Sequence, residues 1–197
     1  MMMIASTEIS DKDELAKQLV ASPRIEDINY IEIVSTKESY VHKSGAWNHS
    51  IKAYNKAVMS DKKVVVIDFG VKRNILNELV NVGLEVEVVP STFKGEDLIA
   101  RYEAKEIGGV FLSNGPGDPL TLINEKKEVQ KLINANIPMF AICLGHQMLS
   151  IAHGYDTYKL KFGQHGGNHP VANNGVVEIT AQNHNYNVPD NIIEIAD

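Results

Sequence analysis

From Lys62 onward the sequence alternates between short runs of β-branched residues and longer stretches with apolar side chains at helical spacing. The run Val64-Val65-Val66-Ile67-Asp68 is apolar at successive positions, which is typical of a strand buried on both faces. This alternation predicts strands over 64–68, 85–89, 109–112 and 137–142, and helices over 74–82, 95–106 and 124–136. Strands and helices in this order indicate an α/β fold with an open, mostly parallel sheet flanked by helices. Functional side chains in such folds gather beyond the carboxyl ends of the strands.

The regions on either side of this pattern are less regular. A short helix is expected over 11–20, with Asp11 as N-cap and Glu14 as its capping-box partner. The segment 30–34 is rich in β-formers, and 44–60 has the character of a connecting stretch. Near the C-terminus, further strands, which we expect to be antiparallel, are predicted over 176–180 and 191–195.

Composition excludes several classes of protein. The net charge of −6 and the lack of a basic run argue against a nucleic-acid-binding surface. No stretch approaches the roughly 20 apolar residues that cross a bilayer, and the first residues do not form a signal peptide. A single cysteine excludes an internal disulfide and fits a reducing compartment. We therefore expect a soluble, cytoplasmic protein.

That single cysteine, Cys143, stands between a short apolar run and an amphipathic stretch. A sharp turn from strand to helix would present its side chain at the helix N-terminus, in the geometry of a nucleophile elbow. The free N–H groups and the dipole of the helix would favour the thiolate, which is the reactive form. The alternative is an inert core cysteine, since free cysteine is among the most buried residue types.

A glycine-rich loop and a set of histidines offer further candidates. The segment 114–119, Asn-Gly-Pro-Gly-Asp-Pro, follows a predicted strand and could supply the backbone N–H groups of an oxyanion hole, or form a plain tight turn. It is not a phosphate-binding loop, so the chain gives no support to nucleotide chemistry. His165 and His169 stand four apart, but the two glycines between them disfavour a helix and hence a metal site. We expect 161–170 to form a loop.

Five segments together resemble the class I, or triad, glutamine amidotransferases, and within them the glutaminase domain of carbamoyl-phosphate synthetase small subunits. They are Asp-Phe-Gly-Val-Lys-Arg-Asn at 68–74, Ser-Asn-Gly-Pro-Gly-Asp-Pro at 113–119, Ala-Ile-Cys-Leu-Gly-His-Gln at 141–147, the block 161–171 and Ala-Gln-Asn-His at 181–184. The resemblance implies a flavodoxin-like amidotransferase domain over 61–197. It also implies that residues 1–60 are the tail of an N-terminal domain and a linker.

What the resemblance implies for activity is glutamine hydrolysis. Cys143 would attack the side-chain amide, release ammonia for carbamoyl phosphate synthesis in the arginine and pyrimidine pathways, and form a thioester that water cleaves. Leu144 and Gly117 would supply the oxyanion donors. The implied glutamine-binding positions are Gly115, Gln147, Asn183, Asn185 and Tyr186. Asn185 stands where the family commonly has glycine, and asparagine tolerates left-handed backbone geometry.

The resemblance also implies the partners. These are L-glutamine and a large synthetase subunit, which would carry ATP and Mg, while this chain would need no cofactor or metal and would contact neither nucleic acid nor a membrane. The sequence departs from the family pattern in one important respect. The histidine that serves as the catalytic base in the family lies in a His-Pro-Glu segment, and no histidine here has glutamate two positions later. His169-Pro170-Val171 has valine at that place.

We therefore expect a fragment of the parent protein, truncated at both ends, that is inactive alone because its catalytic histidine and glutamate are missing. Two alternatives stay open. One is another triad amidotransferase, although the segments at 68–74 and 161–171 argue against it. The other is a non-catalytic scaffold that binds a partner.

Overall fold

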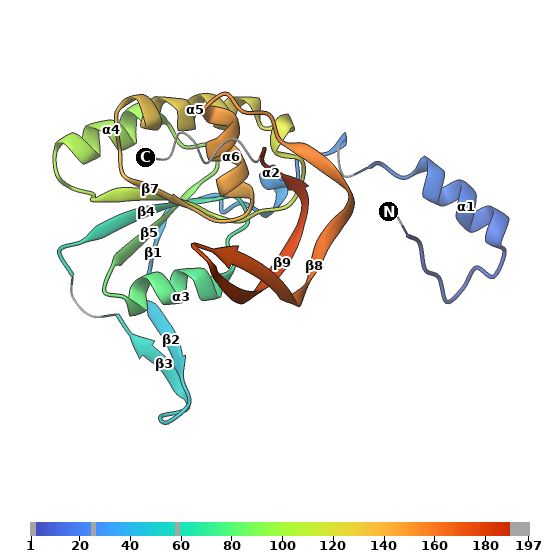
Figure 1. Cartoon of the computed structure of the whole chain (residues 1–197), viewed down its shortest axis with the longest axis horizontal. Coiled ribbons are helices and arrows are strands. Elements are labelled where there is room, and N and C mark those ends of the chain that lie inside the picture. Colours follow the sequence, from blue (N-terminus) through green and yellow to red (C-terminus); the bar gives the residue numbers. More distant parts are fainter. Residues whose placement is uncertain (1–2, 25–26, 58–59, 190–197) are drawn as a thin grey trace.

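A mixed five-stranded sheet forms the centre of the molecule (Figure 1). The computed structural model describes residues 3–24, 27–57 and 60–189. The strands, in spatial order, are β1 (Tyr40–His42), β5 (Glu85–Pro90), β4 (Lys63–Asp68), β6 (Gly109–Leu112) and β7 (Met139–Ala141). Strands β5, β4, β6 and β7 are parallel, and β1 pairs antiparallel with β5. The expected open, mostly parallel sheet is confirmed.

Helices cover both faces of this sheet, as the strand sequences require. On β4, Val65 and Ile67 face one core and Val66 faces the other, and all three are fully buried. The first core is closed by α4 (Gly95–Glu103), α5 (Ile123–Asn134) and α6 (Leu144–Ala152), and the second by α3 (Arg73–Asn81). Figure 1 shows α3 on the opposite side of the sheet from the other three helices. The helices expected over 74–82, 95–106 and 124–136 are thereby confirmed.

The segments before β4 differ in part from expectation. Helix α1 (Lys12–Ala21) begins as predicted, with the Asp11 carboxylate accepting from the N–H groups of Asp13 and Glu14. The prediction of β structure over 30–34 is wrong, since Ile31–Val34 forms the short helix α2. Two contacts accompany this helix: Asn29 Oδ1 accepts the N–H of Ile31 at 3.2 Å, and the Ile31 side chain is buried in the first core.

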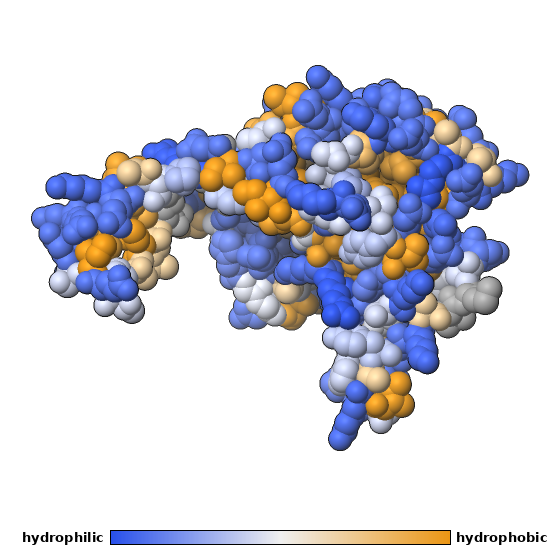
Figure 2. All heavy atoms as spheres, turned by 180° about the vertical axis from the view of Figure 1, so that it is seen from behind, coloured by the Kyte–Doolittle hydropathy of each residue, from blue (hydrophilic) through white to orange (hydrophobic). Residues whose placement is uncertain are grey.

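The connecting stretch expected over 44–60 is also wrong for the described part, because it contains a hairpin of β2 (Ser44–Asn48) and β3 (Ala53–Lys56). An edge-to-face pair of Trp47 and Tyr54, with ring centroids 5.2 Å apart, joins the two strands. Figure 2 shows this hairpin and the α1 arm standing out from the body when the molecule is seen from behind.

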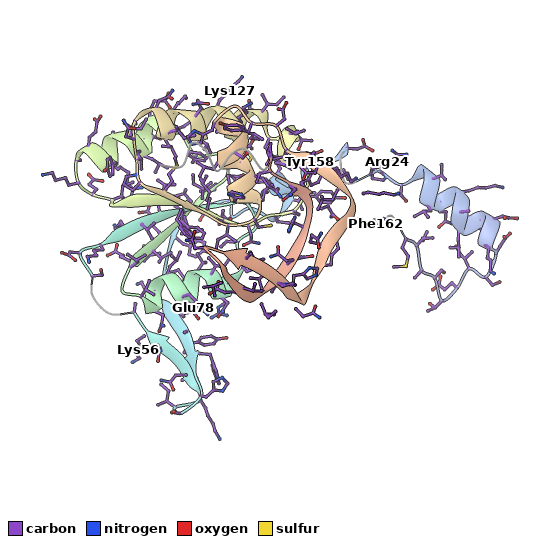
Figure 3. The ribbon with its side chains drawn as sticks, viewed as in Figure 1. Arg24, Lys56, Glu78, Lys127, Tyr158 and Phe162 are labelled. Atoms are coloured by element: carbon purple, nitrogen blue, oxygen red, sulfur yellow. The ribbon has the colours of Figure 1, made fainter. Side chains whose placement is uncertain are left out.

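After α6 the chain forms a long hairpin of β8 (Tyr158–Asn173) and β9 (Val176–Asn187). The antiparallel strand expected over 176–180 is confirmed, whereas the loop expected over 161–170 is wrong. Register shifts between Lys159 and Gln164, and between Gly166 and His169, let the glycines fit within a strand. Figure 3 labels Tyr158 and Phe162 along β8. The predicted strand over 191–195 lies outside the described residues.

None of the helices in the described ranges combines the length and the apolar character needed to span a bilayer. Part of the chain before β4 belongs to the same body, because β1 extends the central sheet and Ile31 is buried in the first core. A short 3-10 helix, η2 (Pro119–Thr121), connects the loop after β6 to α5. The carboxyl ends of β4, β6 and β7, which meet at one edge of the sheet, therefore all carry the segments singled out by the sequence.

Candidate active site

Cys143 lies at the turn between β7 and the N-terminus of α6, as the elbow geometry requires. Its backbone has φ 54° and ψ −110°, a combination that side-chain-bearing residues rarely adopt. Gly145 makes the sharp turn possible. A Cβ at Gly145 would stand 2.6 Å from the Leu112 carbonyl carbon and closer still to its oxygen. The first turn of α6 thus packs directly on the end of β6, and the side chain of Cys143 is left only partly buried.

The glycine-rich loop lies against this elbow. A Cβ on Gly115 would be 2.7 Å from Leu144 Cδ2, 2.9 Å from the carbonyl carbon of Phe69 and closer still to its oxygen. Only glycine fits between the end of β4 and the first turn of α6. Gly117, two residues on, has φ +99° with open space around its Cα, so its requirement is conformational. The loop follows β6 and packs against both the end of β4 and the first turn of α6, so it is more than a plain tight turn.

The sequence predicts that the helix N-terminus favours the thiolate of Cys143, but in the structure burial outweighs that effect. Burial raises the pKa of the Cys143 thiol, while the backbone N–H groups of Leu144 and Gly115 and the ammonium of Lys72 lower it. Burial dominates, so the pKa of the thiol lies above its usual value. Lys72 was not singled out by the sequence. Its backbone N–H donates to Asn114 Oδ1 at 3.1 Å, which ties the start of α3 to the glycine-rich loop.

A cavity of about 390 Å³ opens beside Cys143, between α6 and β9. It brings together four of the residues predicted from the resemblance: Cys143, Gln147, Asn183 and Tyr186. The cysteine Sγ lies 4.0 Å from the backbone oxygen of Asn183. Gln147 is buried, and its Nε2 donates to the backbone oxygen of Tyr186 at 2.8 Å. This hydrogen bond holds the hairpin against the helix and so fixes the wall of the cavity.

The remaining predicted residues take other places. Leu144 and Gly115 reach Cys143 through their backbone N–H groups, and Gly117 follows in the loop. Asn185 lies outside the lining of the cavity, where its Oδ1 faces His165 Nε2 at 3.2 Å. The other ring nitrogen of His165 faces Asn183 Oδ1 at 2.9 Å. His165, which sequence reasoning examined only as a metal ligand, therefore links the two asparagines.

The histidines near the cavity are not placed as a base for Cys143. In the part of the chain that the structure describes, no imidazole nitrogen is hydrogen-bonded to Sγ. Both ring nitrogens of His184 are engaged, with the Tyr186 backbone oxygen at 2.9 Å and Gln182 Oε1 at 3.0 Å. His146 lines the cavity, and although its side chain has exposed surface, desolvation of the ring lowers its pKa. Among the described residues no group of three acidic, histidine or cysteine side chains could hold a metal ion.

Comparison with known proteins places this geometry in context. The profile of the glutamine amidotransferase class-I family matches residues 65–195. The carbamoyl phosphate synthase small chain of Helicobacter hepaticus is 59% identical over 198 aligned positions, which cover 100% of this chain and 52% of that protein. The corresponding small chain of Campylobacter jejuni is 57% identical over 195 positions, covering 98% of this chain and 52% of the relative. The chain thus spans about half the length of the curated relatives it matches.

A solved structure shares the fold. It is a Thermoplasma acidophilum protein described as part of a GMP synthase, with a TM-score of 0.53 and 22% identity over 66% of this chain and 69% of that one. The likeness supports the sheet and helix arrangement alone. The family match spans β4 to β9, and with them the elbow, the glycine-rich loop and the cavity wall. This chain belongs to the class-I glutamine amidotransferase family.

Proposed function

We propose that this chain is the glutamine-hydrolysing part of a carbamoyl phosphate synthase small chain, with Cys143 as nucleophile. The observation that carries the proposal is the position of Cys143. It is a strained elbow residue with two backbone N–H groups at its sulfur, on the wall of a cavity large enough for an amino acid. The relatives that match the whole chain at more than half identity support the choice of this amidotransferase over others.

In the proposed reaction, Cys143 Sγ attacks the side-chain carbonyl carbon of glutamine and forms a C–S bond. The C–N bond of the amide breaks, and the thiol proton leaves with the nitrogen as ammonia. Water then cleaves the γ-glutamyl thioester, which yields glutamate and restores the thiol. The backbone N–H groups of Leu144 and Gly117 stabilise the negative oxygen of each tetrahedral intermediate.

The cavity wall supports recognition of an amino-acid ligand. Asn183 and Tyr186 bring backbone and side-chain polar groups of β9 to the cavity, and Gln147 fixes them against α6. Gly115 lets the loop approach the ligand closely because it has no side chain. Asn185 acts through His165, since one ring nitrogen of His165 contacts Asn185 Oδ1 and the other contacts Asn183 Oδ1.

We propose that the chain alone turns over glutamine several powers of ten more slowly than an intact small chain. The described residues place no imidazole on Sγ, and the sequence holds no histidine with glutamate two positions later. A steady-state glutaminase assay tests this directly. Turnover close to that of an intact small chain would contradict it.

In the parent protein, the ammonia passes to a large synthetase subunit that carries ATP and Mg in the cytoplasm. The reaction then supplies carbamoyl phosphate to arginine and pyrimidine synthesis. In this proposal residues 61–197 are the amidotransferase domain, and residues 1–60 are the end of an N-terminal domain with its linker, of which β1 and Ile31 pack onto the amidotransferase sheet and core. Co-purification of the full gene product with a large subunit tests the partnership.

A labelling experiment tests the proposed nucleophile. A diazoketone analogue of glutamine should alkylate Cys143 in the full gene product, with free glutamine protecting it and asparagine failing to protect it. The Cys143→Ser variant is the matched control, because it removes the sulfur and little else. Mass spectrometry of the peptide that contains residue 143 reads the result.

The second candidate function is a non-catalytic scaffold, which the absence of an imidazole at Sγ among the described residues favours. The same experiment separates the two. A full gene product that resists labelling at Cys143, although it is folded and binds a large subunit, would support the scaffold and overturn the glutaminase.

A further inference from the structure

Ser113 lies where three segments of the site meet. It follows β6 directly, and its exposed fraction is 0%. Its Oγ accepts a hydrogen bond from the backbone N–H of Phe69 at 2.9 Å and donates to the backbone oxygen of Asn114 at 2.9 Å. Its own carbonyl accepts from the N–H of Gly145 at 3.0 Å. One residue therefore connects the end of β4, the glycine-rich loop and the first turn of α6.

The position of Gly115 depends on this connection. Its Cα packs so closely on the Phe69 carbonyl that no side chain fits between them. The N–H of Phe69 is thus held by the hydroxyl of Ser113, and the carbonyl of the same residue lies against Gly115. The Phe69 ring is fully buried and cannot compensate by moving. A shift of the Phe69 backbone would therefore displace Gly115, which lies against it.

We propose that Ser113 is a positioning residue, whose hydroxyl holds the Gly115 backbone N–H against the sulfur of Cys143. Without Oγ, the buried N–H of Phe69 and the carbonyl of Asn114 both lose a partner. The Asn114 side chain still joins the loop to the chain after β4, since its Nδ2 donates to the Gly70 oxygen at 3.1 Å. The Phe69 backbone is no longer held by Oγ, however, and as it shifts the Gly115 N–H moves away from Sγ. The inference deepens the proposed function, since it rests on Cys143 as the reacting group.

The chain provides a matched control in Ser35. This serine is 6% exposed, its Oγ accepts from the backbone N–H of Ser91 at 2.9 Å, and it donates to the backbone oxygen of Thr36 at 3.3 Å. Its hydrogen bonds are therefore of the same kinds as those of Ser113. Ser91 follows β5 and lines a different cavity from the one beside Cys143. Removal of the Ser35 hydroxyl should cost stability while leaving the hydrogen bonds of Ser113 to Phe69, Asn114 and Gly145 unchanged.

The experiment follows alkylation of Cys143 by iodoacetamide as a function of pH, which is clean because the chain has one cysteine. In the unsubstituted chain, the charged or titratable side chain that acts on Sγ is Lys72, and those that line the cavity are His146 and His184. All three are unchanged in the variants. Ser113→Ala should lower the rate at pH 8 by about twofold to threefold and move the midpoint to higher pH, because the thiolate loses an N–H partner. Ser35→Ala should lose a similar amount of thermal stability, and its alkylation rate should depend on pH as in the unsubstituted chain.

A second variant covers the case in which Ser113→Ala does not fold. Ser113→Cys is nearly isosteric, and its thiol is a poorer hydrogen-bond partner, so it should shift the profile in the same direction by a smaller factor. Peptide mapping separates the two cysteines. An unchanged profile in a folded Ser113 variant, or an equal shift in Ser35→Ala, would overturn the proposal. The alkylation assay uses no glutamine. Its result on Ser113 can therefore be interpreted even if the diazoketone analogue fails to label Cys143.

Discussion

Replacing Gly145 with alanine tests how tightly the elbow is built. The added Cβ would lie 2.6 Å from the Leu112 carbonyl carbon and 2.8 Å from its Cβ, and closer still to the Leu112 oxygen. These atoms belong to a central strand, and the Leu112 oxygen already accepts the N–H of Ile142 at 3.1 Å. The strand cannot yield, so α6 must move away from β6 by roughly 1 Å to restore ordinary contact distances.

Two effects of opposite sign set the magnitude. Alanine is a better helix former than glycine by about 1 kcal/mol. Overpacking of a tight contact typically costs about 1–3 kcal/mol, and backbone atoms place this contact at the upper end. We expect a net loss of about 2 kcal/mol in the free energy of unfolding. For a chain of this length, that lowers the midpoint of thermal unfolding by about 6 °C.

Urea and thermal unfolding, followed by circular dichroism, measure the loss. Gly167→Ala is the matched control, because Gly167 lies in β8 with open space at its Cβ position and no positive φ, so it should change stability by less than about 0.5 kcal/mol. The reasoning is refuted if Gly145→Ala is as stable as the parent. It is equally refuted if the two variants lose the same amount.

Three further expectations follow from the charges. Because burial raises the pKa of Cys143, its alkylation at pH 7 should be slower than that of a cysteine in a short peptide and should increase at higher pH; a midpoint at or below the peptide's value would contradict this. Lys72→Met should move that midpoint higher still, whereas Lys72→Arg keeps the cation and should leave it in place. Glu87→Gln removes the charge from a two-point pair with Arg101, at 2.6 and 3.2 Å, and should cost about 1 kcal/mol in urea unfolding. Glu85→Gln affects a more exposed single contact and should cost less.

The sequence predicts the central sheet well because burial is written into each strand. Val65, Val66 and Ile67 can be apolar at successive positions only if both faces of β4 are covered, and the structure shows both cores. The elbow at Cys143 was also predictable, since the apolar run and the amphipathic helix adjoin it. These features depend on local pattern, which a single sequence contains.

The errors fall where distant contacts decide the structure. The hairpin containing Trp47 and Tyr54 depends on a cross-strand pair that no local pattern reveals. The glycines of 161–170 suggested a loop, yet pairing with β9 makes a strand with shifted register. The cavity itself requires the Gln147 side chain to meet the Tyr186 backbone across 39 positions of sequence. The roles of Gln147, Asn183 and Tyr186 stay predictions, while their assembly in one cavity is a feature of the fold.

At Cys143, the backbone conformation that lowers the stability of the fold is also the one that presents the reactive sulfur. With φ at 54° and ψ at −110°, any side chain at this position carries strain, of about 1–3 kcal/mol, that glycine avoids. Cys143→Gly should therefore unfold at a higher temperature than Cys143→Ala. Directed evolution that rewards heat resistance alone would drift toward the glycine and discard the sulfur. Any stabilised descendant of this chain should thus be selected with a cysteine-reactive probe in the same screen.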